Sequence, residues 1–195
     1  MIDLLSSQED FTDQHFDGVD AKKALFEGKI FESCTFSKCN FSGTNFKRSK
    51  FLDCRFEHCD LSNMEIRGAS FRSVNFSDCK LIGVNWTNAS AISHLVFENC
   101  ILNYSNFHGT DLRKSAIKKC IAREADFAET NLSEADCRWT DFASARFSNT
   151  NLIKADLRHA LNYSIRPDAN KLKGAKFTLP EATLLLYGLD IVLEG

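Results

Sequence analysis

The stretch "FSKCNFSGTNFKRSKFLDCRFEHCDL", residues 36–61, places a Phe or Leu at every fifth position. These residues are Phe36, Phe41, Phe46, Phe51, Phe56 and Leu61. A period of five matches neither the 3.6 residues of an α-helical turn nor the period of two of a strand. The spacing runs from Phe11 to Trp86 and, after a shift of one residue, from Phe97 to Leu157. A short extended segment that turns after every five residues predicts a solenoid.

The residues between the large apolar positions follow a pattern of their own. A small residue such as Cys, Ser, Thr or Ala stands two positions before most of them, often followed by Asn or Asp. Positions two apart share a face in extended chain, so the small and large residues should both point inward. Cys39, Cys59 and Cys79 recur every twenty residues. We therefore expect four five-residue faces per coil, with equivalent residues about 4.8 Å apart in successive coils.

Composition narrows the class of protein. The length of 195 residues favours one domain, and the net charge of −2 gives no reason to expect direct binding of nucleic acid or of a membrane surface. No apolar run is long enough to span a bilayer. Eight cysteines without a signal-peptide pattern favour reduced thiols and a cytoplasmic location.

The sequence gives little support for catalysis or for a cofactor. Zinc sites usually contain a C-x2-C pair, whereas the close cysteine pairs here are five residues apart and follow the repeat. None of the five histidines has a nucleophile partner at a familiar spacing, and nucleotide-binding or metalloprotease motifs are absent. We expect a protein that is not an enzyme and has no metal site and no cofactor.

The repeat breaks first at "TNASAISHLV", residues 87–96. Eleven residues separate Trp86 from Phe97 where ten would keep the phase, and Leu95 takes a small-residue position. One reading is a one-residue bulge at a corner. The other is a small protruding loop that contacts a partner through Ser90, Ser93 and His94, since function often lies on irregular loops.

The second break is the C-terminal segment, residues 178–195, which follows a repeat region of residues 1–177. Thr178 and Glu181 have capping-box spacing, and Pro180 suits a first helical turn. These signals predict a helix over residues 180–187 that ends at Gly188, and then a strand. The segment either caps its own tube or also joins two chains across a two-fold axis. The residues of that predicted interface are Leu184, Leu185, Tyr187, Leu189, Ile191 and Leu193.

Acidic residues gather between residues 124 and 141, where Arg138 is the one basic residue beyond Arg123 and before Arg146. The acids are Glu124, Asp126, Glu129, Glu134, Asp136 and Asp141. Regular negative charge on a rod suggests a mimic of the phosphates of duplex DNA, and thus a partner-binding belt. The twenty-residue spacing also places Arg146 one coil from Asp126, so the acids can equally be weakly paired surface residues.

The repeat over residues 10–177 resembles that of the pentapeptide-repeat family, and the resemblance implies a right-handed quadrilateral β-helix. Within that family the chain is similar to the topoisomerase-protecting branch, which includes the albicidin-resistance, quinolone-resistance and microcin-immunity pentapeptide proteins. The segments that carry this similarity are "LIGVNWT" (81–87), "FENCILN" (97–103), "EADFAETNLSEADC" (124–137) and "AKFTLPEATLLLYGLDI" (175–191).

The resemblance implies a homodimer joined through its C-terminal helix. Such a dimer would bind DNA gyrase or topoisomerase IV as a DNA-like rod and rescue the enzyme from a bound poison. The chain departs from the albicidin-resistance pattern, which has a longer insertion after "NWT". The alternative is a non-catalytic scaffold or adaptor for protein–protein interaction unrelated to topoisomerases.

Overall fold

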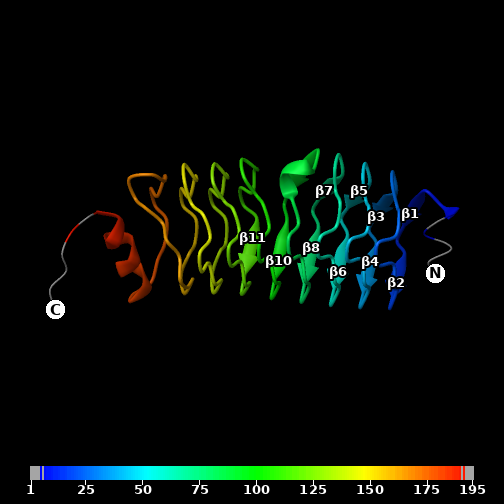
Figure 1. The fold of residues 1–195 in the computed structure, drawn as a ribbon, viewed down its shortest axis with the longest axis horizontal. Helices are drawn as coiled ribbons and strands as arrows, with labels where there is room; N and C mark the ends of the chain where they lie inside the picture. The colour runs from blue at the N-terminus through cyan, green and yellow to red at the C-terminus, as the bar shows by residue number, and fades with distance from the viewer. Residues whose placement is uncertain (1–4, 6, 190, 192–195) are drawn as a thin grey trace.

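The chain winds into a four-walled tube in which each coil lies beside the next (Figure 1). The computed structural model describes residues 5, 7–189 and 191. The chain advances steadily from one end of the rod to the other, as the colour gradient in Figure 1 shows. The predicted all-β solenoid with four faces per coil is confirmed by parallel pairing at twenty-residue steps, as between Phe11 and Phe31.

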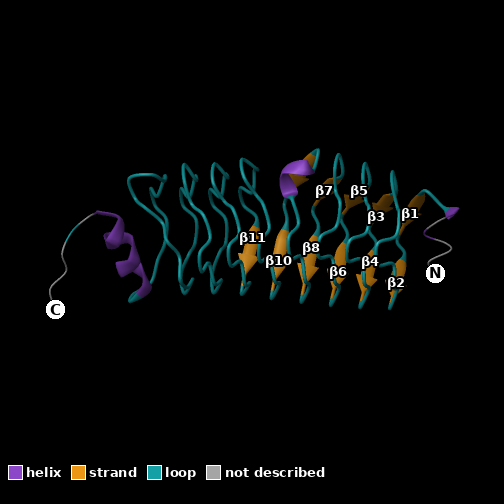
Figure 2. Cartoon of the chain, in the orientation of Figure 1, coloured by secondary structure: helices purple, strands orange, loops and turns teal. Residues whose placement is uncertain are grey.

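Two of the four walls contain short parallel strands, whereas the other two are built from turns (Figure 2). Wall 1 has the strand order β1-β3-β5-β7-β9, and wall 2 has the order β11-β10-β8-β6-β4-β2. The strands of wall 1 are β1 (Asp10–Thr12), β3 (Ile30–Glu32), β5 (Lys50–Leu52), β7 (Ser70–Arg72) and β9 (Ala91–Ser93). Those of wall 2 are β2 (His15–Asp17), β4 (Thr35–Ser37), β6 (Arg55–Glu57), β8 (Asn75–Ser77), β10 (Val96–Glu98) and β11 (Ala116–Lys118).

Walls 3 and 4 are joined by single parallel bridges instead of strands. Asn40 pairs with Asp60 on wall 3, and Asn45 pairs with Glu65 on wall 4. Within each coil these walls close a turn, in which the N–H of Thr44, for example, donates to the carbonyl of Phe41 at 3.0 Å. Backbone groups of these two walls therefore find partners in neighbouring coils or in their own turn.

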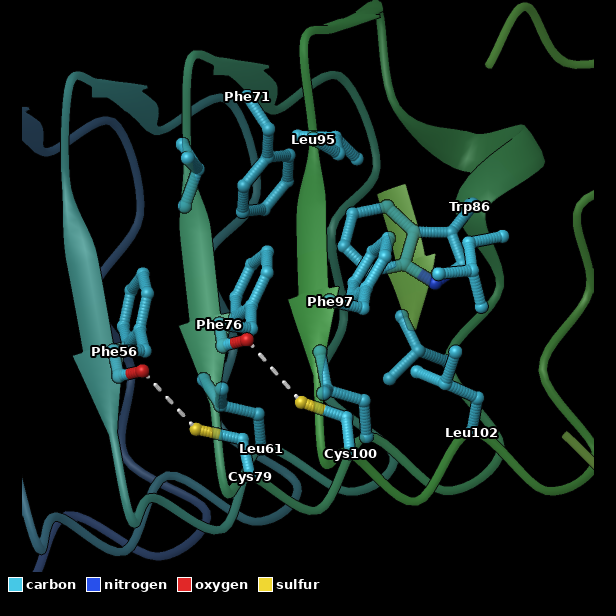
Figure 3. Packing of buried hydrophobic residues seen from close by; sticks show 14 of the residues in the cluster. Phe56, Leu61, Phe71, Phe76, Cys79, Trp86, Leu95, Phe97, Cys100 and Leu102 are labelled. Carbon is cyan, nitrogen blue, oxygen red and sulfur yellow. Dashed lines mark hydrogen bonds between the residues drawn. The ribbon is translucent and has the colours of Figure 1, made fainter. Parts of the chain in front are cut away.

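The large apolar residues form columns inside the tube. The rings of Phe36, Phe56, Phe76 and Phe97 stack along wall 2 with centroid distances of 4.6, 5.1 and 5.1 Å (Figure 3). Rings on adjoining walls meet edge to face, as Phe31 and Phe36 do at 5.3 Å. Offset stacking along a wall and edge-to-face contact across it are both favourable for aromatic pairs.

The small inward residue of each unit often forms a hydrogen bond as well as filling space. At many of these positions the hydroxyl or thiol donates a hydrogen bond to a main-chain carbonyl of the preceding coil, although Thr110 bonds within its own coil and the Ser115 hydroxyl has no partner among the described residues. Thr44 Oγ1 reaches the carbonyl of Ala21 at 2.7 Å, and the Cys79 thiol reaches that of Phe56 at 3.3 Å (Figure 3). A buried polar atom needs such a partner, so Cys, Ser and Thr fill the space and satisfy their own donor.

The Asn or Asp of each unit stabilises the corner that follows it. Asn40 Oδ1 accepts the N–H of Ser42 at 3.1 Å, and Asp60 Oδ1 accepts that of Ser62 at 3.0 Å. This is the Asx-turn geometry in which a side chain bonds the backbone two residues on. The carboxylates and amides in this position are thus part of the fold.

The C-terminal segment differs from its predicted form. The structure has a 3-10 helix, η2 (Glu181–Leu189), which begins one residue after Pro180 and continues past Gly188. The capping box does not form, because Thr178 Oγ1 instead accepts the N–H of His159 at 2.8 Å. Leu189, predicted to begin a strand, belongs to the helix, and Ile191 is not in a strand. Asp190 and residues 192–195 lie outside the described residues.

The helix covers the end of the tube. Leu184 and Leu185 are partly buried against the hydrophobic core, together with Leu172, Ala175 and Phe177. Figure 1 shows η2 at the C-terminal end of the rod, beyond the last coil. Packing of an apolar helix face over an open solenoid end is the capping role that such an end requires.

Candidate interaction surface

The first break in the repeat is a 3-10 turn, η1 (Trp86–Asn88), anchored in the core. The Trp86 side chain is 1% exposed, and its ring stacks on Phe107 at 5.7 Å and meets Phe97 edge to face at 5.5 Å. Asn85 Oδ1 accepts the N–H of Thr87 at 3.2 Å and its hydroxyl at 2.7 Å. The turn is therefore fixed by the buried Trp86 ring on its core side and by the side chain of Asn85, which caps it.

The ladder register locates the inserted residue. Pairing runs at twenty residues from Phe51 to Phe71, at twenty-one from Phe76 to Phe97, and at twenty again from Phe97 to Ile117. The predicted phase shift is confirmed, and Leu95 is fully buried in its small-residue position. The insertion takes the form of η1, which stands at the edge of the tube (Figure 1).

The three predicted contact residues near this turn are in different settings. Ser90 is exposed but bonds its N–H and its hydroxyl to the carbonyl of Ala69, at 2.7 and 3.0 Å. Ser93 is half-buried at the end of β9. His94 is exposed and forms the corner with a φ of 52°. Of the three, His94 is the side chain best placed for contact with a partner.

The aspartates of the predicted acidic belt have structural partners. Asp126, Asp136 and Asp141 are half-buried and accept the N–H two residues on, at 2.9, 3.3 and 3.1 Å. Each also has an arginine partner. The ion pairs are Arg146–Asp126 at 3.0 Å, Arg138–Asp136 at 2.8 Å and Arg123–Asp141 at 2.8 Å. The predicted proximity of Arg146 to Asp126 is confirmed, and these aspartates carry partly compensated charge.

The pKa values of two aspartates reflect these partners. The hydrogen bond from Arg138 holds the pKa of Asp136 below its ordinary value. Partial burial acts to raise the pKa of Asp141, but hydrogen bonds from Asn162 and Arg123 outweigh it, so that pKa is lowered as well. Both carboxylates are ionised at neutral pH and already engaged with cations.

The three glutamates of the belt are the exposed ones. Glu124, Glu129 and Glu134 occupy corners, with φ between 56° and 59°. Glu129 lies 3.8 Å from His108 Nε2, and among the described residues Glu124 and Glu134 form no ion pair. They stand at successive corners of one coil, because each follows the inward residue of a different wall. The belt is thus a ring around the tube, and a partner along one side meets only part of it.

The cysteines lie inside the tube. All eight are free and buried, and burial raises the pKa of Cys137 to about 12. A buried thiol with a raised pKa is a poor nucleophile at neutral pH. Within the described part of the chain, no group of three or more His, Cys, Asp or Glu side chains is placed to hold a metal ion, and no helix is long and apolar enough to cross a membrane.

An exposed aromatic pair was not anticipated from the sequence. Trp139 is 56% exposed, and its ring stacks on His159 with centroids 3.9 Å apart. Ile121 and Leu161, at the neighbouring position of wall 3, are also exposed. The twenty-residue spacing of Trp139 and His159 could have revealed this pair.

The predicted dimer interface is only partly described. Leu184 and Leu185 contact the core of their own chain, as the cap, and Ile191 is 50% exposed. The side chains of Tyr187 and Leu189, and all of Leu193, lie outside the described residues. Dimerisation through this segment stays a prediction.

Comparisons with known proteins agree on the repeat. Residues 29–107 match a family model described as a pentapeptide repeat region, and residues 120–158 match one described as pentapeptide repeats in eight copies. No curated protein matches the sequence.

Solved structures share the fold along nearly the whole chain. A trypsin-treated form of QnrB1, a plasmid-mediated fluoroquinolone resistance protein, is 23% identical with a TM-score of 0.71, covering 96% of this chain and 92% of that one. HetL, a pentapeptide repeat protein involved in heterocyst differentiation regulation from the cyanobacterium Nostoc sp. strain PCC 7120, is 16% identical with a TM-score of 0.64, covering 89% and 90%. Full-length QnrB1 is 21% identical with a TM-score of 0.54. At these identities the likeness concerns the fold.

Proposed function

This chain belongs to the pentapeptide-repeat family, and from that premise we propose that it binds a bacterial type II topoisomerase, DNA gyrase or topoisomerase IV, and protects it from a poison such as a quinolone, albicidin or a peptide toxin. The observation that carries the proposal is the similarity to a fluoroquinolone resistance protein over 96% of this chain. That similarity extends through both breaks in the repeat. The sequence segments at residues 81–87 and 175–191 point the same way.

Protection in this proposal is a matter of binding and shape. The tube is rigid because each coil is bonded to the next along its walls, and its buried thiols supply no chemistry. A rigid rod can occupy a site that normally receives a DNA segment without paying much ordering entropy on binding. The enzyme is then less able to hold the poisoned, cleaved DNA complex.

The contact surface we propose combines η1 with the exposed glutamates. His94 stands at the other end of wall 1 from the turn, and Glu129 and Glu134 at the two corners of that wall are free of arginine partners among the described residues. Uncompensated charge is the part of the acidic belt able to imitate phosphate groups. Asp126, Asp136 and Asp141 serve the fold first, so DNA mimicry in this proposal rests on the glutamates.

We also propose that two chains join through the C-terminal segment. The helix η2 covers the end of the tube with Leu184 and Leu185, and the chain beyond it contains Ile191, which is half-exposed. Leu185→Asp should give a monomer by light scattering if η2 forms the interface. An unchanged mass for the variant, or a monomeric wild type, would reject the dimer.

The test of protection is a gyrase supercoiling assay or a topoisomerase IV decatenation assay, inhibited with ciprofloxacin or albicidin and titrated with this protein. Activity should recover, and the protein should co-elute with the enzyme. A Glu129→Gln, Glu134→Gln double variant should recover less activity at equal concentration. Glu32→Gln, a change of the same type at an exposed position far along the rod, is the matched control. Absence of both recovery and co-elution would contradict the proposal.

A second candidate is a scaffold that binds another protein. It is favoured by the similarity to HetL, which is involved in a developmental process, and by the exposed Trp139–His159 stack. Trp139→Ala should leave topoisomerase protection unchanged if the first proposal holds. If Trp139→Ala abolished protection while the glutamate double variant kept it, the contact surface would lie at wall 2.

A further inference from the structure

The ladder of wall 1 is interrupted at one step, directly after β9. One coil further on, the N–H groups of Leu112 and Lys114 donate to the carbonyls of Asn131 and Ser133 at 2.9 and 3.0 Å, and the N–H of Asn131 donates to that of Thr110 at 2.9 Å. The equivalent donors one coil earlier are Ile92, His94 and Asp111. Within the described residues none of their three rungs forms between β9 and residues 111–113.

The interruption is confined to wall 1. Between the same two coils, the N–H of Ala116 donates to the carbonyl of Leu95 at 3.0 Å on wall 2, and the N–H of Leu102 donates to that of Ile121 at 2.7 Å on wall 3. The tube is therefore continuous, and wall 1 alone has a seam. We call the free edge of β9 and the facing residues 111–114 the β9 seam.

A side-chain bond between the coils is missing at the same step. Thr130 Oγ1 bonds the carbonyl of Phe107 in the coil before it, at 2.7 Å. The equivalent acceptor for Thr110 is the carbonyl of Trp86, which accepts the N–H of Ala89 at 3.1 Å. Thr110 Oγ1 bonds within its own coil instead, to the carbonyl of Phe107 at 2.6 Å. The seam therefore lacks this hydroxyl bond between coils as well as the three backbone rungs.

The seam is hollow at both ends of β9. One hollow of about 330 Å³ is lined by Ile92, Ser93, His94, Asp111, Arg113 and Lys114. A second, of about 370 Å³, lies between η1 and residues 108–111. The two share Ile92 and Asp111, so they form one groove that follows the strand.

The groove presents the groups that a peptide backbone recognises. Unpaired N–H and C=O groups along a strand edge are a template for another extended chain. At the end of β9, His94 and Lys114 are exposed and form no ion pair among the described residues, whereas Arg113 is engaged with Asp111 at 2.6 Å. The Lys114 ammonium group, without an ion-pair partner at this end, favours an acidic side chain there, and the His94 imidazole can donate a hydrogen bond to it.

We propose that the β9 seam binds an extended peptide segment of a partner protein by strand addition, with an acidic residue beside His94 and Lys114. The segment pairs with the N–H groups of Ile92 and His94. This site does not depend on the partner being a topoisomerase, so the two proposals can fail separately.

The test uses a display library of random eight-residue peptides selected on the wild-type protein. The variant Ile92→Pro removes the N–H on the free edge, a change that an edge strand tolerates. Selected peptides should carry Asp or Glu near one end and bind Ile92→Pro at least about tenfold more weakly, since one lost backbone bond and its register are at stake. Lys114→Glu, which leaves the strand intact, should weaken the same peptides.

A matched pair of synthetic peptides keeps the test independent of how the variants fold. A selected peptide that is N-methylated at alternate residues should lose binding in one of the two methylation phases and keep it in the other, because a strand offers every second N–H to one edge. Bound peptide should shift the amide resonances of Ile92, His94 and Asp111. Failure to select any peptide that distinguishes wild type from Ile92→Pro, equal loss in both phases, or shifts confined to other walls would overturn the proposal.

Discussion

The two halves of the tube, before and after η1, share one backbone but use different side chains. Before the turn, most large inward positions hold Phe, and walls 1 and 2 are strands. After it, Leu, Ala and Cys fill many of these positions, and single bridges replace strands beyond β11. The surfaces differ as well. Among the described residues, Arg48–Glu27 is the one ion pair before the turn, and the rest lie after it.

The ladder itself is the same in both halves. The N–H of Asn40 donates to the carbonyl of Val19 at 2.8 Å, and the N–H of Asn151 donates to that of Thr130 at 3.0 Å. The coil therefore depends on the small–Asn/Asp–large pattern and on its hydrogen bonds, and Phe is not required. What changes along the rod is the source of stability. Before η1 it is stacked aromatic rings, and after η1 it is a core of smaller side chains with ion pairs that each contribute little.

The largest effect should come from the aromatic half. Phe56→Ala removes a ring stacked on Phe36 and Phe76 and should lower the free energy of unfolding by about 3–5 kcal/mol. Leu132→Ala in the second half should cost about 2–3 kcal/mol, near the lower end for buried leucine. Urea titrations of the two variants measure the difference. An equal or smaller loss for Phe56→Ala would remove the distinction between the halves.

A smaller effect is expected from the buried hydroxyls, which both halves contain. Thr130→Val keeps the shape but removes the hydrogen bond to the carbonyl of Phe107, and should cost about 1–2 kcal/mol. Thr44→Val, which removes the bond to Ala21, should cost the same. Thr130→Ser keeps the donor and serves as the control. A neutral Thr130→Val would mean that the hydroxyl only fills space.

Lowering the pH should destabilise the second half of the tube before the first, because the ion-paired aspartates lie in the second half. The pKa values of Asp136 and Asp156 are lowered, first by hydrogen bonds from Arg138 and Arg158, so their stabilisation is present above the ordinary carboxyl pKa of 3.8. It is lost as the pH falls through their lower folded values. Amide hydrogen exchange should therefore accelerate in residues 120–160 before residues 30–80 as the pH drops below 3.8. Uniform acceleration along the rod would contradict this.

The smallest change is expected from removing charge while keeping the turn. Asp126→Asn retains the oxygen that accepts the N–H of Ala128 and loses only the exposed pairing with Arg146. The free energy of unfolding should change by less than about 0.5 kcal/mol. Asp126→Ala, which also removes the Asx turn, should cost more. Equal effects of the two substitutions would show that charge, and not the turn, is what matters at this position.

The regular part of the molecule could be predicted well from the sequence, because each position of the five-residue repeat has a fixed place in the coil. The spacing of Phe36 to Leu61 gives the walls, the column of Cys39, Cys59 and Cys79 gives the coil, and both were confirmed. Arg146–Asp126 followed from the same spacing. The acidic cluster looked continuous in the sequence but is wrapped around one coil, with its aspartates in structural positions.

The irregular parts depend on competition between distant partners, which a local pattern does not contain. Thr178 looked like a helix cap, yet its oxygen accepts the N–H of His159 from the preceding coil. At the β9 seam, which follows η1, Thr110 Oγ1 bonds within its own coil and not to the preceding one. Arg123 pairs with Asp141 eighteen residues away, off the twenty-residue step.

Because the ladder returns to a twenty-residue step after η1, the number of whole coils sets the distance between this turn and the C-terminal helix. One extra residue is absorbed at a single turn, and the ladder from Phe97 onward resumes its phase. Adding twenty residues between β11 and the C-terminal helix would move η1 and the helix apart by about 4.8 Å, and removing twenty would bring them closer by the same distance. The distance between the two irregular features is thus graduated in whole coils, and lineages can adjust it by duplication or deletion of one coil.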